Sequence, residues 1–335
     1  MYTFEQIDLA EINLEEYDNF TDKTPFTTIP WMKFLMSYAG AAPVIVRITE
    51  SDTDTLVGYF TGLTIRKFGL KLFGSPFEGW STCYMAYDVY DQSLIKDLLA
   101  PTIRFIFKKT GCVYLELVER NLTTDDFGYI GEKLRGMGGF EYKLDTVPSL
   151  ELDIDKPDAE LLRAIKRDCR KYIRQFEIRG ASVEIVEPTV EFIEEIYAQA
   201  IEVFAKQDLV PPYPIEKIGK LLENLQGSEM LLCLVIREPQ QWKNIASCIF
   251  AGCNKKCFGF FTGSYREFQH FRPNEYLIWY GIRYFRDRGY TVFDYSGVAA
   301  YKYKWNPREV YYTRIMAARY PGWNFLRNKS KGIYR

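Results

Sequence analysis

The chain has 335 residues, of which 47% are hydrophobic and 26% are charged, and its formal net charge is −1. This length allows two domains of ordinary size. The balanced charge argues against a global attraction to nucleic acid, although a local basic face is still compatible with one. The sequence has no signal peptide and no run of about 18 apolar residues, which predicts that nothing spans a membrane. Seven scattered cysteines, an odd number, predict a reducing cytoplasm.

The first half of the chain has the pattern of an α/β domain. Residues 1–24 are acidic and weakly patterned. Alternating or continuous apolar runs with β-branched residues predict strands, and apolar residues at helical spacing predict helices. The expected strands are 44–49, 56–66, 70–76, 113–118 and 141–154, and the expected helices follow Trp31 and cover 93–110 and 124–136.

A basic connecting helix is predicted over residues 157–179. Leu162, Ile165, Cys169, Ile173 and Phe176 share one face of this helix. A second face carries four arginines at spacings of four, three and four: Arg163, Arg167, Arg170 and Arg174. After it we expect a strand at 183–186, helices at 189–206 and 215–225, and strands at 230–237 and 245–252.

The stretch from Phe258 to Asn306 has the most distinctive order of elements. An apolar strand ends in Gly263-Ser264, and a polar, aromatic loop follows. A helix then begins at Pro273 and stops at Gly289, since proline favours the first helical position and glycine the position past the end. A short strand at 291–295 leads into a Ser296-Gly297 turn.

The first half contains a similar series. Gly74-Ser75 corresponds to Gly263-Ser264, and Leu115-Glu116 corresponds to Phe293-Asp294. In both halves an aromatic and basic helix end, a glycine stop and a strand with one carboxylate recur at similar offsets. Chance similarity between two generic helix–strand units is the alternative. We favour two related domains, 1–150 and 151–335.

The stretch resembles the FemAB-like (BioF2-like) transferases of the acetyltransferase-like GNAT superfamily. Gly263-Ser264, Trp279, Phe293–Gly297 and Tyr301–Asn306 occupy the slots of the family motifs. Ser296 and Asn306 stand where the family has glycine. The resemblance implies an α/β fold with mixed sheets of the α+β type, built as two tandem GNAT-like domains with a cleft between them. It also implies acyl or aminoacyl transfer to an amine.

The donor is left open between aminoacyl-tRNA and acyl-CoA, with no tightly bound cofactor. GNAT enzymes that use acyl-CoA hold its pyrophosphate on a glycine-rich turn at a helix N-terminus. Here residues 265–274 contain no glycine, and Pro273 removes one N–H donor. Relatives that share this departure use aminoacyl-tRNA and act on a cell-wall precursor.

Substrate-binding residues follow from the resemblance. Arg167, Arg170 and Arg174 suit phosphate oxygens, because a guanidinium group offers paired N–H donors. Lys33 resembles a family lysine that contacts the phosphate of the acceptor, and Ser264 belongs to the Gly-Ser slot. For the arginines and Lys33, the alternative is a solvated side chain.

Lys302 is the first catalytic candidate, because the family places this lysine in the transfer cleft, where it could stabilise an oxyanion. Lys304 is the candidate instead of Lys302 if the family motif aligns with this chain two residues further along. Direct attack by an amine needs a base, for which Asp294, Tyr265 and His270 are candidates. A buried structural aspartate is at least as compatible with the position of Asp294.

No metal site is predicted, since His270 is the only histidine and no Walker loop or GxGxxG motif is present. We therefore expect a cytoplasmic acyltransferase that acts on an amino group of a peptidoglycan or polysaccharide precursor. The resemblance allows aminoacyl-tRNA as a partner and peripheral contact with a membrane. Two alternatives remain open: an acyl-CoA N-acetyltransferase of an amino sugar or small amine, and a catalytically silent glycan- or peptide-binding module.

Overall fold

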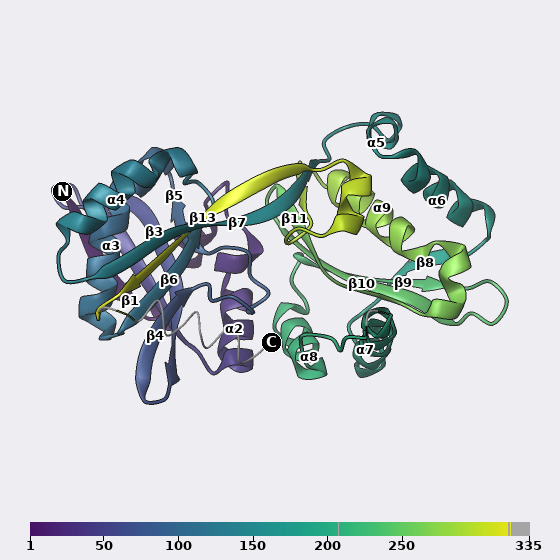
Figure 1. Cartoon of the computed structure of the whole chain (residues 1–335), viewed down its shortest axis with the longest axis horizontal. Helices are drawn as coiled ribbons and strands as arrows, with labels where there is room; N and C mark the ends of the chain where they lie inside the picture. Colours follow the sequence, from purple (N-terminus) through teal and green to yellow (C-terminus); the bar gives the residue numbers. More distant parts are fainter. Residues whose placement is uncertain (207, 321, 323–335) are drawn as a thin grey trace. The chain divides into compact units, whose positions relative to one another are not determined.

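The computed structural model describes residues 1–206, 208–320 and 322. The chain divides into two compact units (Figure 1). Unit 1 contains residues 1–148 and the segment that begins at Tyr311, and unit 2 contains residues 149–310. The chain passes from one unit to the other within two strands, β7 (Glu141–Asp153) and β13 (Arg308–Ala318).

Unit 1 is a mixed sheet with strand order β1-β2-β3-β4-β6-β13, and β5 pairs with β3. Short 3-10 turns at Leu9–Glu11, Pro25–Thr27, Gln92–Leu94 and Thr124–Asp126 link some of its elements. The elements are β1 Tyr2–Ile7, α1 Leu14–Asp18, α2 Ile29–Ala39, β2 Ala42–Glu50, β3 Leu56–Lys67, β4 Leu70–Ser75, β5 Ala86–Val89, α3 Ile95–Thr110, β6 Tyr114–Glu119 and α4 Phe127–Gly136.

The main core of unit 1 lies between this sheet and helices α3 and α4. Alternate residues of the strands, such as Val44, Val46 and Ile48, meet the apolar face of α3. Helix α3 ends where Gly111 adopts a left-handed conformation with φ 69°, as the glycine stop predicts. The strand β1 was not expected from the weak pattern of residues 1–24; it pairs with β2 from Tyr2 to Ile7.

Unit 2 has the strand order β7-β12-β11-β10-β9-β8. Figure 1 shows α9 and α6 on one side of these strands and α7 and α8 on the other. The elements are α5 Asp158–Ala164, α6 Arg167–Ile178, β8 Ser182–Ile185, α7 Val190–Ala205, α8 Ile215–Leu225, β9 Leu231–Arg237, β10 Asn244–Cys253, β11 Lys256–Ser264, η5 Arg266–Phe271, α9 Pro273–Arg286, β12 Val292–Asp294 and η6 Ala300–Trp305.

Each unit contains a parallel pair of strands joined through a helix. In unit 1 β4 and β6 are parallel and α3 connects them; in unit 2 β11 and β12 are parallel and α9 connects them. A parallel pair requires such a crossover. The two units therefore share the mixed α/β architecture that the recurring motifs predicted.

The prediction of one basic helix over residues 157–179 is wrong. The chain forms two helices, because Ile165 and Lys166 adopt extended conformations between α5 and α6. Ile165 is buried in the core of unit 2, and the Lys166 N–H donates to the Lys304 carbonyl (2.9 Å) instead of continuing a helix. The four arginines consequently do not form one continuous face.

The C-terminal strand β13 pairs with β6 from Thr313 to Ala318, so this segment is part of the unit 1 sheet. The sequence had assigned it with all of residues 151–335 to the second domain. The boundary at residue 150 between two GNAT-like domains stays a prediction.

Candidate functional site

The parallel strands β11 and β12 separate soon after they meet. Their pairing covers Lys256 to Phe258 on β11 and Val292 to Asp294 on β12. Strand β12 ends there, but β11 continues to Ser264 along β10. The second half of β11 therefore has a backbone edge that no other strand pairs with in the part of the chain that the structure describes.

Thr262 is the exposed residue on this open edge. The Tyr265 N–H donates to the Ile245 carbonyl (3.0 Å), so the backbone N–H of Tyr265 points toward β10. Because backbone polar groups alternate between the two edges of a strand, those of Thr262 point away from β10. An extended ligand that contains amide groups can bind such an edge by adding backbone-type hydrogen bonds.

Asp294 ends β12 and is completely buried. Its carboxylate accepts hydrogen bonds from the Ser149 hydroxyl (2.6 Å) and the Ser296 N–H (2.8 Å), and the Lys256 ammonium lies 3.3 Å away. The side chain thus orders the turn after β12, and its surroundings are those of a structural aspartate. Its proposed role as a base stays a prediction.

The Lys302 ammonium donates to two carbonyls of the same turn, those of Tyr295 (2.7 Å) and Gly297 (3.0 Å). Asp294 and Lys302 therefore meet at one turn next to the open edge of β11. Since both side chains hold this turn, we regard Lys302 as a residue that positions the turn beside the open edge of β11. A direct role of Lys302 toward the reacting atoms stays a prediction.

Ser296 and Asn306 occupy the two slots where the family has glycine. Both have φ of 54°, in the left-handed region. Glycine adopts this region freely and asparagine relatively easily, while serine is less favoured there. The chain therefore keeps the backbone conformation that explains glycine in these slots.

Tyr265 directly follows β11 and lines an open hollow of about 860 Å³ in unit 2. The Glu195 carboxylate of α7 lies close enough to its hydroxyl to interact with it electrostatically. Burial raises the pKa of Tyr265, and Glu195 raises it further. Tyr265 is consequently protonated at neutral pH and can act on a proton only together with a partner such as Glu195.

The other predicted residues lie apart from this turn. Ser264 is buried, and its hydroxyl accepts from the Gln269 side chain (2.6 Å). Lys304 pairs with Glu275 (2.6 Å). His270 is exposed on η5, where its Nδ1 lies 3.0 Å from the Glu267 carbonyl.

The predicted phosphate-binding residues have different surroundings. Arg170 donates to the carbonyls of Leu162 (3.1 Å) and Arg163 (3.2 Å), so it caps the C-terminus of α5. Arg167 and Arg174 are exposed on α6. Lys33 is exposed on α2 in unit 1. Their substrate contacts stay predictions.

The loop before α9 has little capacity to hold a pyrophosphate. It folds as the 3-10 helix η5, not as an irregular loop, and Arg272 adopts a left-handed conformation just before Pro273. Within the described ranges, no group of three or more His, Cys, Asp and Glu side chains could hold a metal ion. None of the described helices is long and apolar enough to cross a membrane.

The corresponding place in unit 1 is filled. The parallel pairing of β4 with β6 reaches Ser75, and a Cβ atom at Gly74 would lie 2.4 Å from the Phe77 ring. The chain then returns, and the Met85 N–H donates to the Val118 carbonyl (3.4 Å). Among the residues described, unit 1 therefore has no open edge comparable to that of β11.

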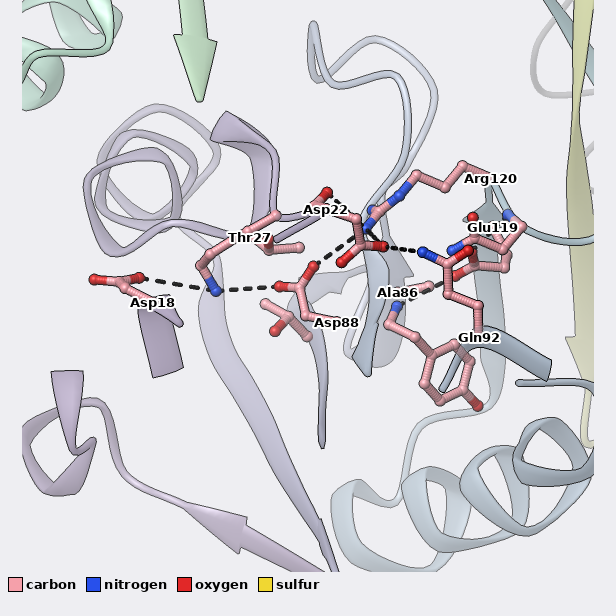
Figure 2. Close-up of polar contacts among 12 residues, drawn as sticks. Asp18, Asp22, Thr27, Ala86, Asp88, Gln92, Glu119 and Arg120 are labelled. Atoms are coloured by element: carbon pink, nitrogen blue, oxygen red, sulfur yellow. Dashed lines mark hydrogen bonds and ion pairs between the residues drawn. The ribbon is translucent and has the colours of Figure 1, made fainter. Parts of the chain in front are cut away.

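Unit 1 instead contains a buried charged network. Figure 2 shows Asp22, Asp88 and Arg120 directed toward one another. Lys23 lies 3.1 Å from Asp88, and Arg120 lies 2.8 Å from Asp22 and 3.4 Å from Asp88. Burial alone raises the pKa of Asp88, but Lys23 and Arg120 outweigh it and hold the pKa below its ordinary value. We assign this network a structural role, since its charges are paired.

Sequence reasoning missed two residues of α7, Glu195 and Gln199. Gln199 is fully buried against Gly263, and among the described residues its amide atoms have no hydrogen-bond partner. Helical spacing places Glu195 and Gln199 four residues apart on one face. That spacing was the available signal, but it did not show that this face meets the end of β11.

The model of the "Acetyltransferase (GNAT) domain" matches residues 163–305, which lie within unit 2. No curated protein matches the chain. Among solved structures, FemX is similar with a TM-score of 0.72 at 14% identity, over 92% of this chain and 96% of that one.

Two further structures are similar at lower scores. A conserved protein of unknown function from Bacteroides thetaiotaomicron VPI-5482 has a TM-score of 0.55 at 12% identity, covering 95% of this chain and 100% of that one. A tandem GNAT protein from the clavulanic acid biosynthesis pathway has a TM-score of 0.50 at 11% identity, covering 96% and 99%. At these identities the likeness concerns the fold. The family match identifies residues 163–305 as a GNAT acetyltransferase-type domain, and the chain as a whole has a fold similar to that of FemX.

Proposed function

We propose that the chain transfers an acyl or aminoacyl group to an amino group of a cell-envelope precursor, of peptidoglycan or of a polysaccharide, and forms an amide bond. The observation that carries the transfer step is the open edge of β11 beside the end of β12, inside the segment that matches the GNAT domain. The envelope substrate rests on the resemblance to FemAB-like transferases.

The donor lies extended along β11, and Thr262 supplies backbone hydrogen bonds to it. The turn after β12, which Asp294 and Lys302 hold, lies on the side of the donor opposite to β11. The amine attacks the activated carbonyl directly, so no covalent enzyme intermediate is required. A nearby base collects the proton that the amine loses.

An acyl-CoA donor is the second candidate, and the match to an acetyltransferase domain favours it. The amide-containing arm of coenzyme A suits a strand edge. Against it stands the loop at Arg266–Phe271, whose 3-10 turn and following Pro273 offer few N–H groups to a pyrophosphate. Aminoacyl-tRNA is the donor that such a loop favours.

Donor binding distinguishes these candidates. Purified protein is titrated with charged bulk tRNA, acetyl-CoA and longer acyl-CoAs at two salt concentrations. Binding of tRNA that weakens steeply with salt supports aminoacyl transfer, because phosphate contacts release counterions. Binding of CoA with little dependence on salt supports the second candidate. If neither donor binds, the proposed transfer is wrong.

Two substitutions at Thr262 test the edge itself. Thr262→Pro removes the backbone N–H group at the open edge of β11, and an edge position tolerates proline. We expect the affinity for the donor to fall roughly tenfold. Thr262→Val loses only the hydroxyl contact to Cys248 (3.0 Å) and should bind the donor as the wild type does. Equal affinity of both variants, with unchanged thermal unfolding, would rule out the edge as the donor site.

A silent binding module is tested at Lys302. Lys302→Ala removes both bonds to the turn, and in a transferase we expect turnover to fall by roughly 100-fold. Lys302→Arg should recover part of it, because a guanidinium group can still donate to carbonyls. If the wild type binds donors but turns over none of them, the silent binding module is favoured.

A further inference from the structure

The hairpin between β3 and β4 carries an exposed aromatic residue at its tip. Its two-residue turn is Phe68-Gly69, and both residues have positive φ, 51° and 77°. Figure 1 shows this hairpin, beside the label β4, projecting from the rest of unit 1. Phe68 is 92% exposed, so it takes no part in the core of unit 1.

Phenylalanine is an unfavourable residue for this turn. Turns in which both central residues have positive φ favour asparagine, aspartate or glycine at the first of them. A bulky side chain is an outlier in the left-handed region. Neither the local conformation nor packing within unit 1 therefore explains Phe68. A contact of its ring with an apolar phase outside the chain would offset the conformational cost.

Cations surround this tip. Arg66 and Lys67 end β3 and are exposed, and Lys71 follows on β4. The strand register places Arg66 directly opposite Lys71. Like charges directly opposite each other destabilise an antiparallel pair, and none of the three side chains has an ion pair or a hydrogen bond among the described residues. An anionic surface bound at the tip would offset this repulsion.

The end of α3 adds two cations beside the hairpin. Lys108 and Lys109 lie in the last turn of α3, and both are exposed without an ion pair among the residues described. The Val113 N–H donates to the Lys71 carbonyl (2.9 Å), which places this end of α3 next to β4. The carboxylate of Glu141, at the start of β7, accepts from a backbone N–H and pairs with neither lysine.

We propose that this basic hairpin end, which consists of Arg66, Lys67, Phe68, Lys108 and Lys109, docks unit 1 on an anionic lipid surface. Phe68 enters the boundary between headgroups and acyl chains, and the four cations lie among the headgroup phosphates. Their long stems can stay in the apolar boundary while their charges reach the headgroups. Anionic lipids attract each cation near the surface. This inference goes beyond the proposed transfer and does not depend on its donor.

A lipid surface fits these residues better than RNA does. Single-stranded RNA stacks its bases on several aromatic faces in succession, whereas Phe68 is the one exposed aromatic residue of the hairpin. Double-stranded RNA is recognised through phosphates and 2′-hydroxyl groups, which offer no apolar partner to Phe68. A lipid surface supplies both phosphates and, just below them, an apolar layer.

Co-sedimentation of the full chain with vesicles tests the proposal. Vesicles of phosphatidylcholine alone are compared with vesicles of equal parts phosphatidylcholine and phosphatidylglycerol, at low and at high salt. We expect binding to the anionic vesicles only, and weaker binding at high salt, because salt screens exposed charges. No binding to the anionic vesicles at low salt, or equal binding to both kinds of vesicle, overturns the proposal.

Phe68→Asn removes the apolar side chain and keeps the turn, since asparagine adopts positive φ readily. We expect its affinity for the anionic vesicles to fall roughly tenfold, without a loss of thermal stability. Trp242→Asn is the matched control, because Trp242 is also exposed (57%) and has φ 57°, but lies between β9 and β10 in unit 2. It should bind as the wild type does. Equal effects of the two substitutions would overturn the proposal.

The cations are tested by the double variant Arg66→Gln with Lys67→Gln, which should lower the affinity for anionic vesicles roughly tenfold or more. Lys96→Gln with Lys133→Gln is the control of equal charge. Both are exposed lysines of unit 1 that lie over the Tyr129 ring, and Lys96 is at the other end of α3. This control should keep most of the affinity. Equal losses in the two double variants would show an effect of net charge alone and would contradict the proposal.

Poly(U) RNA is the competing probe, measured with the same variants. We expect Phe68→Asn to leave any binding of poly(U) unchanged. Binding of poly(U) that Phe68→Asn weakens, in a chain that does not bind anionic vesicles, would assign the basic hairpin end to RNA and overturn the lipid contact. Donor binding and turnover are measured without vesicles, so failure of the lipid contact and failure of the transfer are distinguished.

Discussion

Ser296 has a conformation that suits glycine better. Its φ of 54° lies in the left-handed region, and its hydroxyl is buried without a hydrogen-bond partner among the described residues. A side chain in this region costs about 1 kcal/mol or more, except for asparagine, aspartate and glycine. Asn306 has the same φ at little cost. The two replacements are therefore not equivalent, although they look alike in the sequence.

Ser296→Gly should raise the free energy of unfolding by about 1 kcal/mol, because relief of backbone strain exceeds the added freedom of glycine in the unfolded chain. Asn306→Gly should give no gain, since asparagine tolerates this conformation. Urea unfolding of both variants measures the difference. A loss of stability in Ser296→Gly would show that the serine makes a favourable contact.

Glu119 is a buried carboxyl group that titrates near neutral pH. It accepts hydrogen bonds from the N–H groups of Tyr87 (3.2 Å) and Asn121 (2.8 Å) and has no exposed surface. Burial raises its pKa to about 7, against the lowering effect of Arg120. The folded protein therefore holds this proton at pH values where the unfolded chain has released it.

The sign of the resulting pH dependence follows from linkage. The contribution of Glu119 to the free energy of unfolding is complete below pH 4.5, decreases as the pH rises toward 7, and does not change further at higher pH. The fall amounts to about 3 kcal/mol. Chemical unfolding of the wild type and Glu119→Gln between pH 4.5 and 7 checks this, and we expect a flatter slope in the variant. Parallel slopes would contradict the raised pKa.

At the scale of elements, helix α7 rests directly on β11. A Cβ atom at Gly263 would lie 2.6 Å from Gln199 Cβ and 3.0 Å from the Ile196 carbonyl oxygen. The close approach requires glycine at this position and brings Glu195 to the end of β11. A pattern of apolar residues cannot reveal such a contact, because it identifies the buried face of α7 and not the residue beneath it.

Gly263→Ala should lower the free energy of unfolding by about 2 kcal/mol, since overpacking forces the helix away from the strand. Gly219→Ala in α8 is the control: nothing lies within 4 Å of the added methyl group, and alanine should stabilise the helix by up to about 1 kcal/mol. Changes of opposite sign in the free energy of unfolding by urea, a loss in Gly263→Ala and a gain in Gly219→Ala, confirm the contact. Equal effects of the two substitutions would exclude it.

The break between α5 and α6 was equally hidden from the sequence. Ile165 and Cys169 continue the apolar spacing of a single helix, and both are indeed buried. The helix stops because the Lys166 N–H bonds to the Lys304 carbonyl, far along the chain. Helical periodicity could therefore predict the buried face but not the interruption.

For the whole molecule, each unit has a parallel strand pair, but among the described residues only in unit 2 does the first strand of the pair continue past its partner as an open edge. In unit 1 the Phe77 ring lies against Gly74, and Phe77 packs edge-to-face on Trp80 (5.1 Å). The two occurrences of the motif are thus alike in topology and different in what they can bind.

We expect one donor molecule to bind per chain, because the place in unit 1 that corresponds to the open edge is occupied by side chains. Isothermal titration of the full chain with whichever donor binds measures the stoichiometry. Thr262→Pro should weaken this single event. Two equivalent sites, or one site that the Thr262 substitution leaves unaffected, would show that unit 1 binds a donor.

The mixed α/β class, the strands that contain Gly263-Ser264 and Phe293-Asp294, and the helix between them could be predicted from the sequence, because these features depend on local periodicity and on proline and glycine signals. Which side chains are available for chemistry depends on tertiary contacts. Asp294 accepts a hydrogen bond from the Ser149 hydroxyl, 145 residues earlier in the chain, and Tyr265 lies close to Glu195 of α7. Such pairings join residues that are distant in the chain, so no local pattern encodes them.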